Sequence, residues 1–323
     1  MFKNPGLQAS AWGFRGSKPE NIYFGKELWR VMRQYLGNKK AILFFLLPAM
    51  LIYTIIIIYP VLQTVYRSFY NWDGLSDATF NGLGNFRDLF TDPLLKTSLK
   101  NGGIFALVLV VFQIGLGTIL ALVCADVTVK GRKLLKTAYF IPVVLSVTVV
   151  CQLWIAIYDP TNGLINRLLQ MLGIPYQQHW LTSPTKSIIA IAFVNAWQFM
   201  GYQFALLYAG VKSIPEQYME AATIDGCSKW KAHWKVTLPL MKETYKFCFT
   251  IAITGGISAF TQMLIMTNGG PGTSNYTMTF MVYRYAFLES NYGYACAVAV
   301  VLVIISLIAT VVINKVFDRN EAV

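Results

Sequence analysis

Six long apolar segments without a single Asp, Glu, Lys or Arg dominate the sequence. They cover roughly residues 41–62, 102–125, 137–158, 188–211, 247–267 and 294–314. Each has about 20 residues or more, enough for a helix to cross a hydrocarbon core about 30 Å thick. None shows the period-two alternation of barrel strands, and only helices or closed barrels can span lipid. We therefore expect an all-α, polytopic membrane helix bundle with six transmembrane helices.

The distribution of basic residues gives the orientation of these helices. If the N-terminus lies inside, 20 of the 27 Lys and Arg fall on the inner side and 7 on the other. Cytoplasmic loops of membrane proteins carry such an excess of Lys and Arg. Both termini are thus expected in the cytoplasm. The same asymmetry accounts for the net charge of +12 without a nucleic-acid partner.

Three regions are expected along the chain: a cytoplasmic N-terminal tail at 1–40, a transmembrane domain at 41–316 and a cytoplasmic C-terminal tail at 317–323. The tail carries an apolar stripe at helical spacing, flanked by basic side chains. The stripe is made by Leu28, Val31, Met32, Tyr35 and Leu36. This pattern favours an amphipathic helix in the membrane interface, although a solvated basic tail stays a possible alternative.

Catalytic and nucleotide-binding motifs are absent from the sequence. There is no G-x-x-x-x-G-K-[ST], G-x-S-x-G, H-E-x-x-H or C-x-x-C. We therefore expect a non-catalytic subunit without a cofactor or metal of its own. Proton- or ion-coupled pumps usually keep ionisable groups at membrane depth, and the six segments have none. A secondary transporter that uses broken helices, a passive channel and a membrane scaffold remain as alternatives.

A polar loop at about 212–246 separates the fourth and fifth apolar segments. Ser213 and Glu216 have the spacing of a capping box, which predicts a helix that begins at Ser213. Gly226 stands where a left-handed residue would end that helix. A second helix is expected from Ser228 to Val236, closed by Pro239. The loop thus reads as two short helices folded about Gly226.

The motif in this loop carries a resemblance to a known family. E-A-A-x-x-D-G, a hydrophobic residue ten positions after the glycine and then L-P resemble the EAA loop of binding-protein-dependent ABC importer permeases. The matching residues are Glu220, Ala221, Ala222, Asp225, Gly226, Val236, Leu238 and Pro239. Cys227 and Val236 depart mildly, since the family usually has Ala and Ile there. Residues 260–287, with their T-x-G-G-P-G motif, are similar to carbohydrate-type permeases. Permeases with this motif are the first of the two permease subunits in maltose-like and glycerol-3-phosphate-like importers.

The resemblance implies a set of partners in a bacterial cytoplasmic membrane. They are a second homologous permease that completes a heterodimer, two cytoplasmic ATPase subunits that hold ATP and magnesium, and an extracytoplasmic solute-binding protein. The EAA helices would dock into a cleft on each ATPase. The alternative for this loop is an amphipathic connector that rests on lipid headgroups. Lys229, Lys231 and Lys235 would suit such a location.

Uncharged polar side chains in two apolar segments are the candidate substrate site. They are Asn195, Gln198, Tyr202 and Gln203 in the fourth segment, and Ser258, Thr261 and Gln262 in the fifth. Amides, hydroxyls and an aromatic ring suit a neutral sugar, such as an oligosaccharide or glycan fragment. The same residue types also join membrane helices by hydrogen bonds, which is the structural alternative. Glycerol 3-phosphate or another polyol is the alternative substrate.

Overall fold

The computed structural model describes residues 39–174 and 177–318. The expected amphipathic helix in the N-terminal tail lies outside the described residues. The chain divides into two compact units, one ending at Leu62 and one beginning at Gln63. α2 (Lys39–Tyr53), a π-helical turn at Thr54–Ile58 and α3 (Tyr59–Arg67) follow one another without a break, and the candidate membrane span Ile42–Arg67 lies within them. Pro48 lies inside α2, and no described side chain up to Leu62 is buried.

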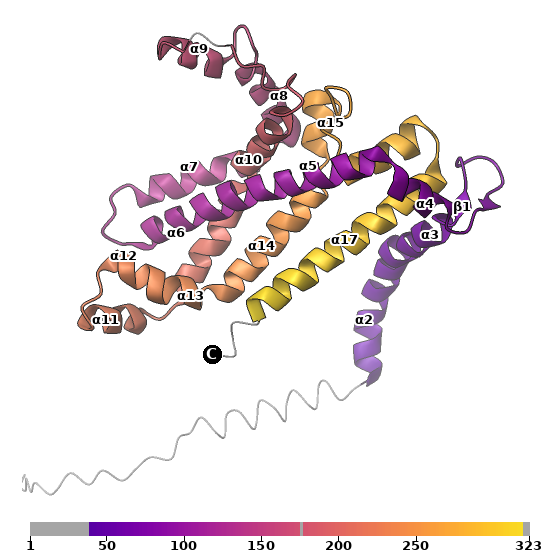
Figure 1. Cartoon of the computed structure of the whole chain (residues 1–323). Coiled ribbons are helices and arrows are strands. Elements are labelled where there is room, and N and C mark those ends of the chain that lie inside the picture. The colour runs from indigo at the N-terminus through magenta and orange to yellow at the C-terminus, as the bar shows by residue number, and fades with distance from the viewer. Residues whose placement is uncertain (1–38, 175–176, 319–323) are drawn as a thin grey trace, which may run out of the picture. The chain divides into compact units, whose positions relative to one another are not determined.

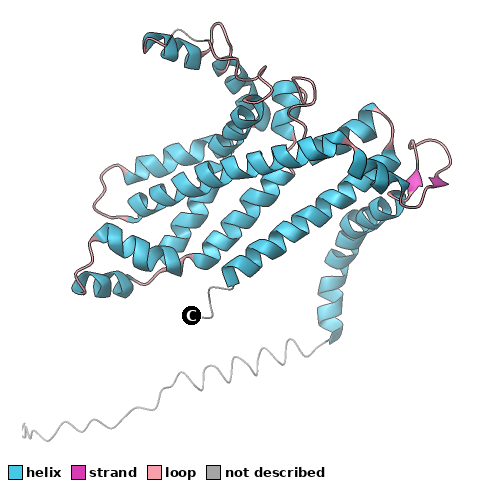
Figure 2. Cartoon of the chain, in the orientation of Figure 1, coloured by secondary structure: helices cyan, strands magenta, loops and turns pink. Residues whose placement is uncertain are grey.

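The second unit is a bundle organised on one very long helix (Figures 1 and 2). This helix consists of α5 (Pro93–Leu109), a π-helical segment η2 (Val110–Leu116) and α6 (Gly117–Ala125), 33 residues in total. It packs against α10 (Ser187–Ser213) and α14 (Lys242–Ile257), and α14 packs in turn on α17 (Tyr292–Asp318). The expected all-α membrane bundle is confirmed.

Two of the predicted spans are broken helices. α7 (Arg132–Val144) and α8 (Val147–Ile157) meet at 102°, because Leu145 and Ser146 adopt extended backbone just after Pro142. α14 and α15 (Thr261–Thr267) meet at 43°. Among the described residues, four helices are long and apolar enough to cross a membrane, or six if each bent pair is one span. The six apolar segments of the sequence agree with the larger number.

Short elements join these helices at their ends. β1 (Tyr70–Asn71) and β2 (Thr79–Phe80) form a small antiparallel ladder in which Tyr70 pairs with Phe80. The remaining short helices outside the polar loop are α4 (Gly84–Thr91), α9 (Leu164–Met171), α16 (Met278–Tyr283) and the π-helical η4 (Arg284–Leu288).

Glycine and asparagine residues allow the bundle helices to pack closely. Gly256 of α14 lies against Ala106 of α5, so that a Cβ on Gly256 would stand only 2.7 Å from the Ala106 Cβ. The amide of Asn101 on α5 donates to the carbonyls of Ser274 at 2.6 Å and Tyr276 at 2.8 Å.

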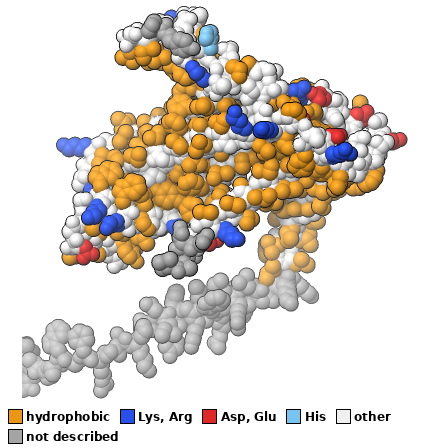
Figure 3. Space-filling view, viewed as in Figure 1, with side chains coloured by type: hydrophobic (Ala, Val, Ile, Leu, Met, Phe, Trp, Pro, Cys, Tyr) orange, Lys and Arg blue, Asp and Glu red, His pale blue; other side chains and the backbone are white. Residues whose placement is uncertain are grey.

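The outer surface is apolar, and Figure 3 shows hydrophobic side chains spread over the drawn face of the bundle. Such a surface suits lipid or a partner chain.

Candidate functional site

The first helix of the polar loop is α11 (Glu216–Ile224). The predicted capping box is wrong: Ser213 is the last residue of α10, and its hydroxyl donates to the carbonyl of Gly210 at 2.8 Å. Pro215 takes the N-cap position with an extended backbone and no side-chain hydrogen bond. The serine hydroxyl is used by the preceding helix, so it cannot cap the following one.

Gly226 ends α11 in the left-handed conformation that the sequence predicted, with φ of +75°. The Gly226 N–H donates to Thr223 and the Cys227 N–H to Ala222, at 3.0 and 2.9 Å, which satisfies carbonyls left free at the helix end. A Cβ at position 226 would meet no atom within 4 Å. The backbone angle, and not lack of space, therefore requires glycine here.

The second arm of the loop is longer than predicted. It runs through α12 (Lys229–Ala232), the π-helical η3 (His233–Thr237) and α13 (Leu238–Leu240). The expectation that Pro239 closes this helix is wrong, because Pro239 lies in the first turn of α13. A proline lacks the N–H, and at the first turn after a change of hydrogen-bonding pattern that N–H is not needed.

The two arms present an exposed surface at one end of the bundle. Glu220, Ala221, Asp225, Gly226 and Pro239 are exposed, Leu238 is half-buried and Ala222 is buried. Large apolar side chains lie beside them in the open: Ile224 is 86% exposed, Trp230 58% and Trp234 70%. Exposed groups of this size are typical of a surface that another protein or a membrane covers.

Polar contacts hold the two arms together and attach them to the end of α6. The imidazole Nδ1 of His233 lies 3.0 Å from the hydroxyl of Thr237, whose oxygen lies 3.5 Å from the sulfur of Met219 on α11. Burial lowers the pKa of His233 and so favours the neutral form of the ring. Lys229 forms an ion pair with Asp126, the residue that follows α6.

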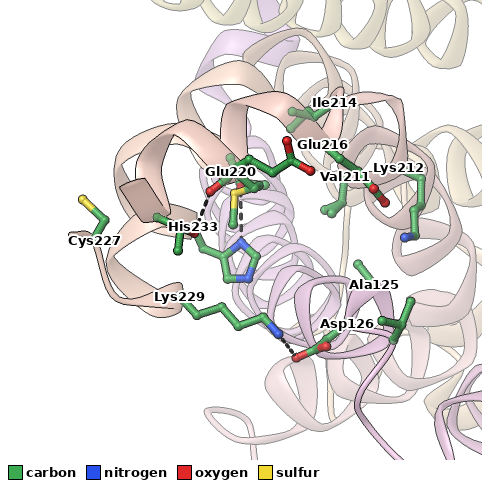
Figure 4. Close-up of a pocket in the computed structure, with 14 residues that line it drawn as sticks. Ala125, Asp126, Val211, Lys212, Ile214, Glu216, Glu220, Cys227, Lys229 and His233 are labelled. Carbon is green, nitrogen blue, oxygen red and sulfur yellow. Dashed lines mark hydrogen bonds and ion pairs between the residues drawn. The ribbon is translucent and has the colours of Figure 1, made fainter. Parts of the chain in front are cut away.

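A cavity of about 550 Å³ lies inside this arrangement. Its walls come from the end of α6, the end of α10 and both arms of the loop (Figure 4). Lys229 reaches across this space to Asp126 and the His233 ring projects into it, whereas Cys227 points away. The loop is therefore a hinged pair of helices that stands off the bundle and touches it at discrete points.

The structure separates the candidate substrate residues of α10. Gln198 is fully buried and Gln203 is 1% exposed, whereas Tyr202 is 45% exposed and Asn195 is half-buried. The Gln198 side-chain amide donates to the carbonyl of Leu145 at 3.0 Å, at the break between α7 and α8. The side-chain oxygens of both glutamines have no hydrogen-bond partner in the described part of the chain. Asn195 and Tyr202 thus share the accessible face of α10.

The candidate residues from the fifth segment lie at the bend between α14 and α15. Ser258 and Thr261 are exposed there, whereas Gln262 is buried. The Ser258 hydroxyl donates to Thr254 at 2.7 Å, and its carbonyl accepts from the Thr279 hydroxyl at 3.1 Å. Both α14 and α15 contact α10. The accessible polar groups of α10 and those of the bend between α14 and α15 therefore lie on helices that contact each other.

The fold and this loop define a polytopic helical membrane protein with a helical hairpin at one end. Residues 113–321 match the family described as binding-protein-dependent transport system inner membrane component, and the chain belongs to this family. It is a permease subunit of the ABC importer type, as the EAA motif implied.

Curated relatives and a solved structure agree with the family. The probable ABC transporter permease protein YurN of Bacillus subtilis is 34% identical over 88% of this chain and 98% of its own length. The multiple sugar-binding transport system permease protein MsmF of Streptococcus mutans is 31% identical over 90% and 98%. The crystal structure of a bacterial ABC transporter for the acidic polysaccharide alginate has a chain with the same fold. Its TM-score is 0.75 and its identity 21%, over 91% of this chain and 99% of that one.

Proposed function

We propose that this chain is one of two homologous permease subunits in an ATP-driven importer for a sugar, such as an oligosaccharide or glycan fragment. The observation that carries this proposal is the exposed helical hairpin about Gly226, which bears the E-A-A-x-x-D-G motif. The name of the Streptococcus mutans relative supports a sugar as the substrate.

In this proposal the hairpin is the contact with a cytoplasmic ATPase. The coupling residues are Glu220, Ala221, Ala222, Asp225, Gly226, Leu238 and Pro239. Small side chains allow close approach of another surface, and exposed Glu220 is available to pair with a cation on the ATPase. Closure of the ATPase dimer on ATP and magnesium would move the hairpins and switch the pathway between two states. The excess of Lys and Arg supports a cytoplasmic location for this end and for both termini.

The solute is proposed to pass along the accessible face of α10. Asn195 and Tyr202 offer an amide and a phenol there, and Ser258 and Thr261 add hydroxyls from the neighbouring bend. Uncharged hydrogen-bonding groups beside an aromatic ring suit the hydroxyls and apolar faces of a neutral sugar. The apolar segments have no Lys or Arg, which favours a neutral solute over glycerol 3-phosphate. An extracytoplasmic solute-binding protein would deliver the sugar.

The coupling role is tested with Glu220→Lys and Gly226→Val in the transporter complex with its ATPase. Gln217→Lys, which introduces a lysine at another exposed position of α11, is the control for Glu220→Lys. We expect both coupling variants to reach the membrane in normal amount and to lose uptake of a panel of labelled neutral di- and trisaccharides. The control should keep uptake. Unaltered uptake in either coupling variant would refute this role, and uptake without any ATPase would support a secondary transporter instead.

A further inference from the structure

The long helix from Pro93 to Ala125 has an aspartate immediately outside each end. Asp92 precedes it and Asp126 follows it. Each carboxylate binds side chains from a distant part of the chain. At 1.5 Å per residue, 33 residues span about 50 Å, so the two carboxylates stand at opposite ends of the bundle.

At the inner end, Asp126 is held in one position from two directions. Its Oδ1 accepts hydrogen bonds from the Thr128 N–H at 2.9 Å and from the Thr128 hydroxyl at 2.8 Å. Its Oδ2 binds the ammonium group of Lys229, the first residue of α12. The Asp126 side chain is only 16% exposed and the Lys229 side chain 55%. The carboxylate is thus a fixed anchor, and the lysine reaches to it from the loop.

At the outer end, Asp92 joins the helix to two other elements. Its Oδ1 accepts from the Leu94 N–H at 2.8 Å and so caps α5. Its Oδ2 accepts from the phenols of Tyr285 on η4 and Tyr294 on α17, at 2.7 and 3.0 Å. A movement of the long helix along its axis would therefore displace η4 and the start of α17.

The covalent chain attaches the polar loop to α10 and α14, and to no other helix. The loop leaves α10 after Ser213 and enters α14 at Lys242. Between the loop and the end of α6 lies the 550 Å³ cavity, lined by Ala125 and Val127 on one side and Met219 and Thr223 on the other. Because this space is open, α11 does not push on α6 by packing across it. The Lys229–Asp126 ion pair bridges it.

We propose that Asp126 and Lys229 are positioning residues that couple the movement of the loop to the long helix, which carries it to the extracytoplasmic end through Asp92. This rests on the proposed ATPase-coupling role of the loop. The loop would then act on the long helix in two ways: indirectly through α10 and α14, which pack against it, and directly at the end of α6 through the ion pair. Hydrogen bonds and ion pairs at both ends of a rigid helix form the kind of contiguous network that can carry coupling between distant sites.

The Lys229–Asp126 pair can pass a displacement from the loop to the long helix, and the fold does not depend on it for stability. An ion pair with one exposed partner contributes at most about 1 kcal/mol to stability. The Lys229 ammonium and the Thr128 hydrogen bonds lower the pKa of Asp126 well below its usual range. Because the folded-state pKa is lowered, the pair is complete above the ordinary carboxyl range and is lost only as the pH falls below it. It therefore stays charged throughout the neutral range.

The test uses the whole transporter in nanodiscs and a readout that needs no solute. Lys96→Cys places a thiol on the exposed first turns of α5, at the outer end of the long helix. Its labelling rate with a charged maleimide is followed by mass spectrometry of the peptide that contains position 96. The rate is compared between the nucleotide-free complex and the complex trapped with ATP and vanadate. Asp126→Asn and Lys229→Gln are introduced in turn, together with Lys231→Gln as the control.

We expect the nucleotide-dependent change in labelling to fall about two- to five-fold in both variants, the range that corresponds to 0.5–1 kcal/mol. Lys231→Gln removes the same charge from the same helix, where the described residues offer no ion-pair partner, and should keep the full change. Exchanging the charges, with Asp126→Lys and Lys229→Asp together, should restore most of it.

The proposal is overturned if either single variant keeps the full change, if Lys231→Gln loses as much, or if the wild-type complex shows no change at position 96. Failure of the proposed function looks different. In that case Glu220→Lys would leave uptake and stimulated ATP hydrolysis intact. If Glu220→Lys uncouples the complex while the ion-pair variants behave as wild type, only the link to the long helix is refuted.

Discussion

The phenol of Tyr285 donates a 2.7 Å hydrogen bond to the Asp92 carboxylate, across 193 residues of sequence. The contact joins η4 to the N-cap residue of α5. The phenol of Tyr294 binds the same oxygen. One carboxylate thus holds three elements together.

Loss of this contact should weaken the packing at this end of the bundle. A hydrogen bond to a charged group contributes about 1.5–3 kcal/mol. We expect Tyr285→Phe to lower the Tm of the detergent-purified protein by a few degrees, since about 1 kcal/mol corresponds to about 2–4 °C for 150–250 residues and to less for a longer chain such as this one. Tyr283→Phe is the control, because the Tyr283 hydroxyl makes no hydrogen bond to the described residues. Equal Tm values for the two variants would contradict the role of the Asp92 contact.

Two adjacent glycines of α14 should respond oppositely to the same substitution. A Cβ on Gly256 would collide with Ala106 of α5, whereas a Cβ on Gly255 would meet nothing within 4 Å. Overpacking costs about 1–3 kcal/mol, and alanine gains up to about 1 kcal/mol over glycine in an open helical position. We expect Gly256→Ala to lower the yield of folded protein and its Tm, and Gly255→Ala to leave both unchanged or higher. A tolerated Gly256→Ala would mean that α5 and α14 do not approach this closely.

The backbone angle at Gly226 predicts a graded effect on coupling. A left-handed residue costs an ordinary side chain about 1–2 kcal/mol, asparagine tolerates it, and a β-branched residue is a strong outlier. Gly226→Val should therefore reduce uptake at constant protein level, and Gly226→Asn should retain most of it. Uptake and the ATP hydrolysed per solute are measured in the same vesicles. If valine and asparagine behave alike, the angle is not what the loop requires.

The two faces of α10 should separate a substrate role from a structural one. Tyr202→Ala is expected to raise the half-saturating sugar concentration about five-fold or more, the equivalent of about 1 kcal/mol of lost contact, with Tm unchanged. Gln198→Ala leaves the Leu145 carbonyl without its donor, which costs about 1–3 kcal/mol. It should lower Tm and the amount of protein instead.

Both quantities are measured for both variants, with the sugar of the panel that wild type takes up fastest. Uptake kinetics that are unchanged in Tyr202→Ala would remove the accessible face of α10 from the proposed pathway. An unchanged Tm in Gln198→Ala would refute the structural role of this amide.

Local pattern was enough for several features of this protein. Charge-free apolar runs predict membrane helices because lipid accepts no unsatisfied backbone group, whatever the neighbours are. The left-handed Gly226 follows equally from its position after a helix-forming run. The family resemblance also resides in short motifs of the polar loop and of residues 260–287.

Capping and helix ends were less predictable. Ser213 has the spacing of an N-cap, yet its hydroxyl turns back to Gly210, because α10 extends two residues beyond its apolar stretch. Pro239 is found inside a helical arm, since a π-helical turn before it shifts the hydrogen-bonding pattern. In both cases the hydrogen bonding of the preceding helical segment selected one of two local conformations that the sequence allowed.

The sequence by itself thus determined the membrane bundle, the hinged polar loop and the family. Tertiary structure alone decided that α7 and α8 break at 102°, that Gln198 is buried while Tyr202 is accessible, and that Asp126 meets Lys229. The division has a physical reason. Burial in lipid and backbone conformation act on each residue through its immediate neighbours in the chain. An ion pair between residues 103 positions apart forms only when packing of whole helices brings their ends together.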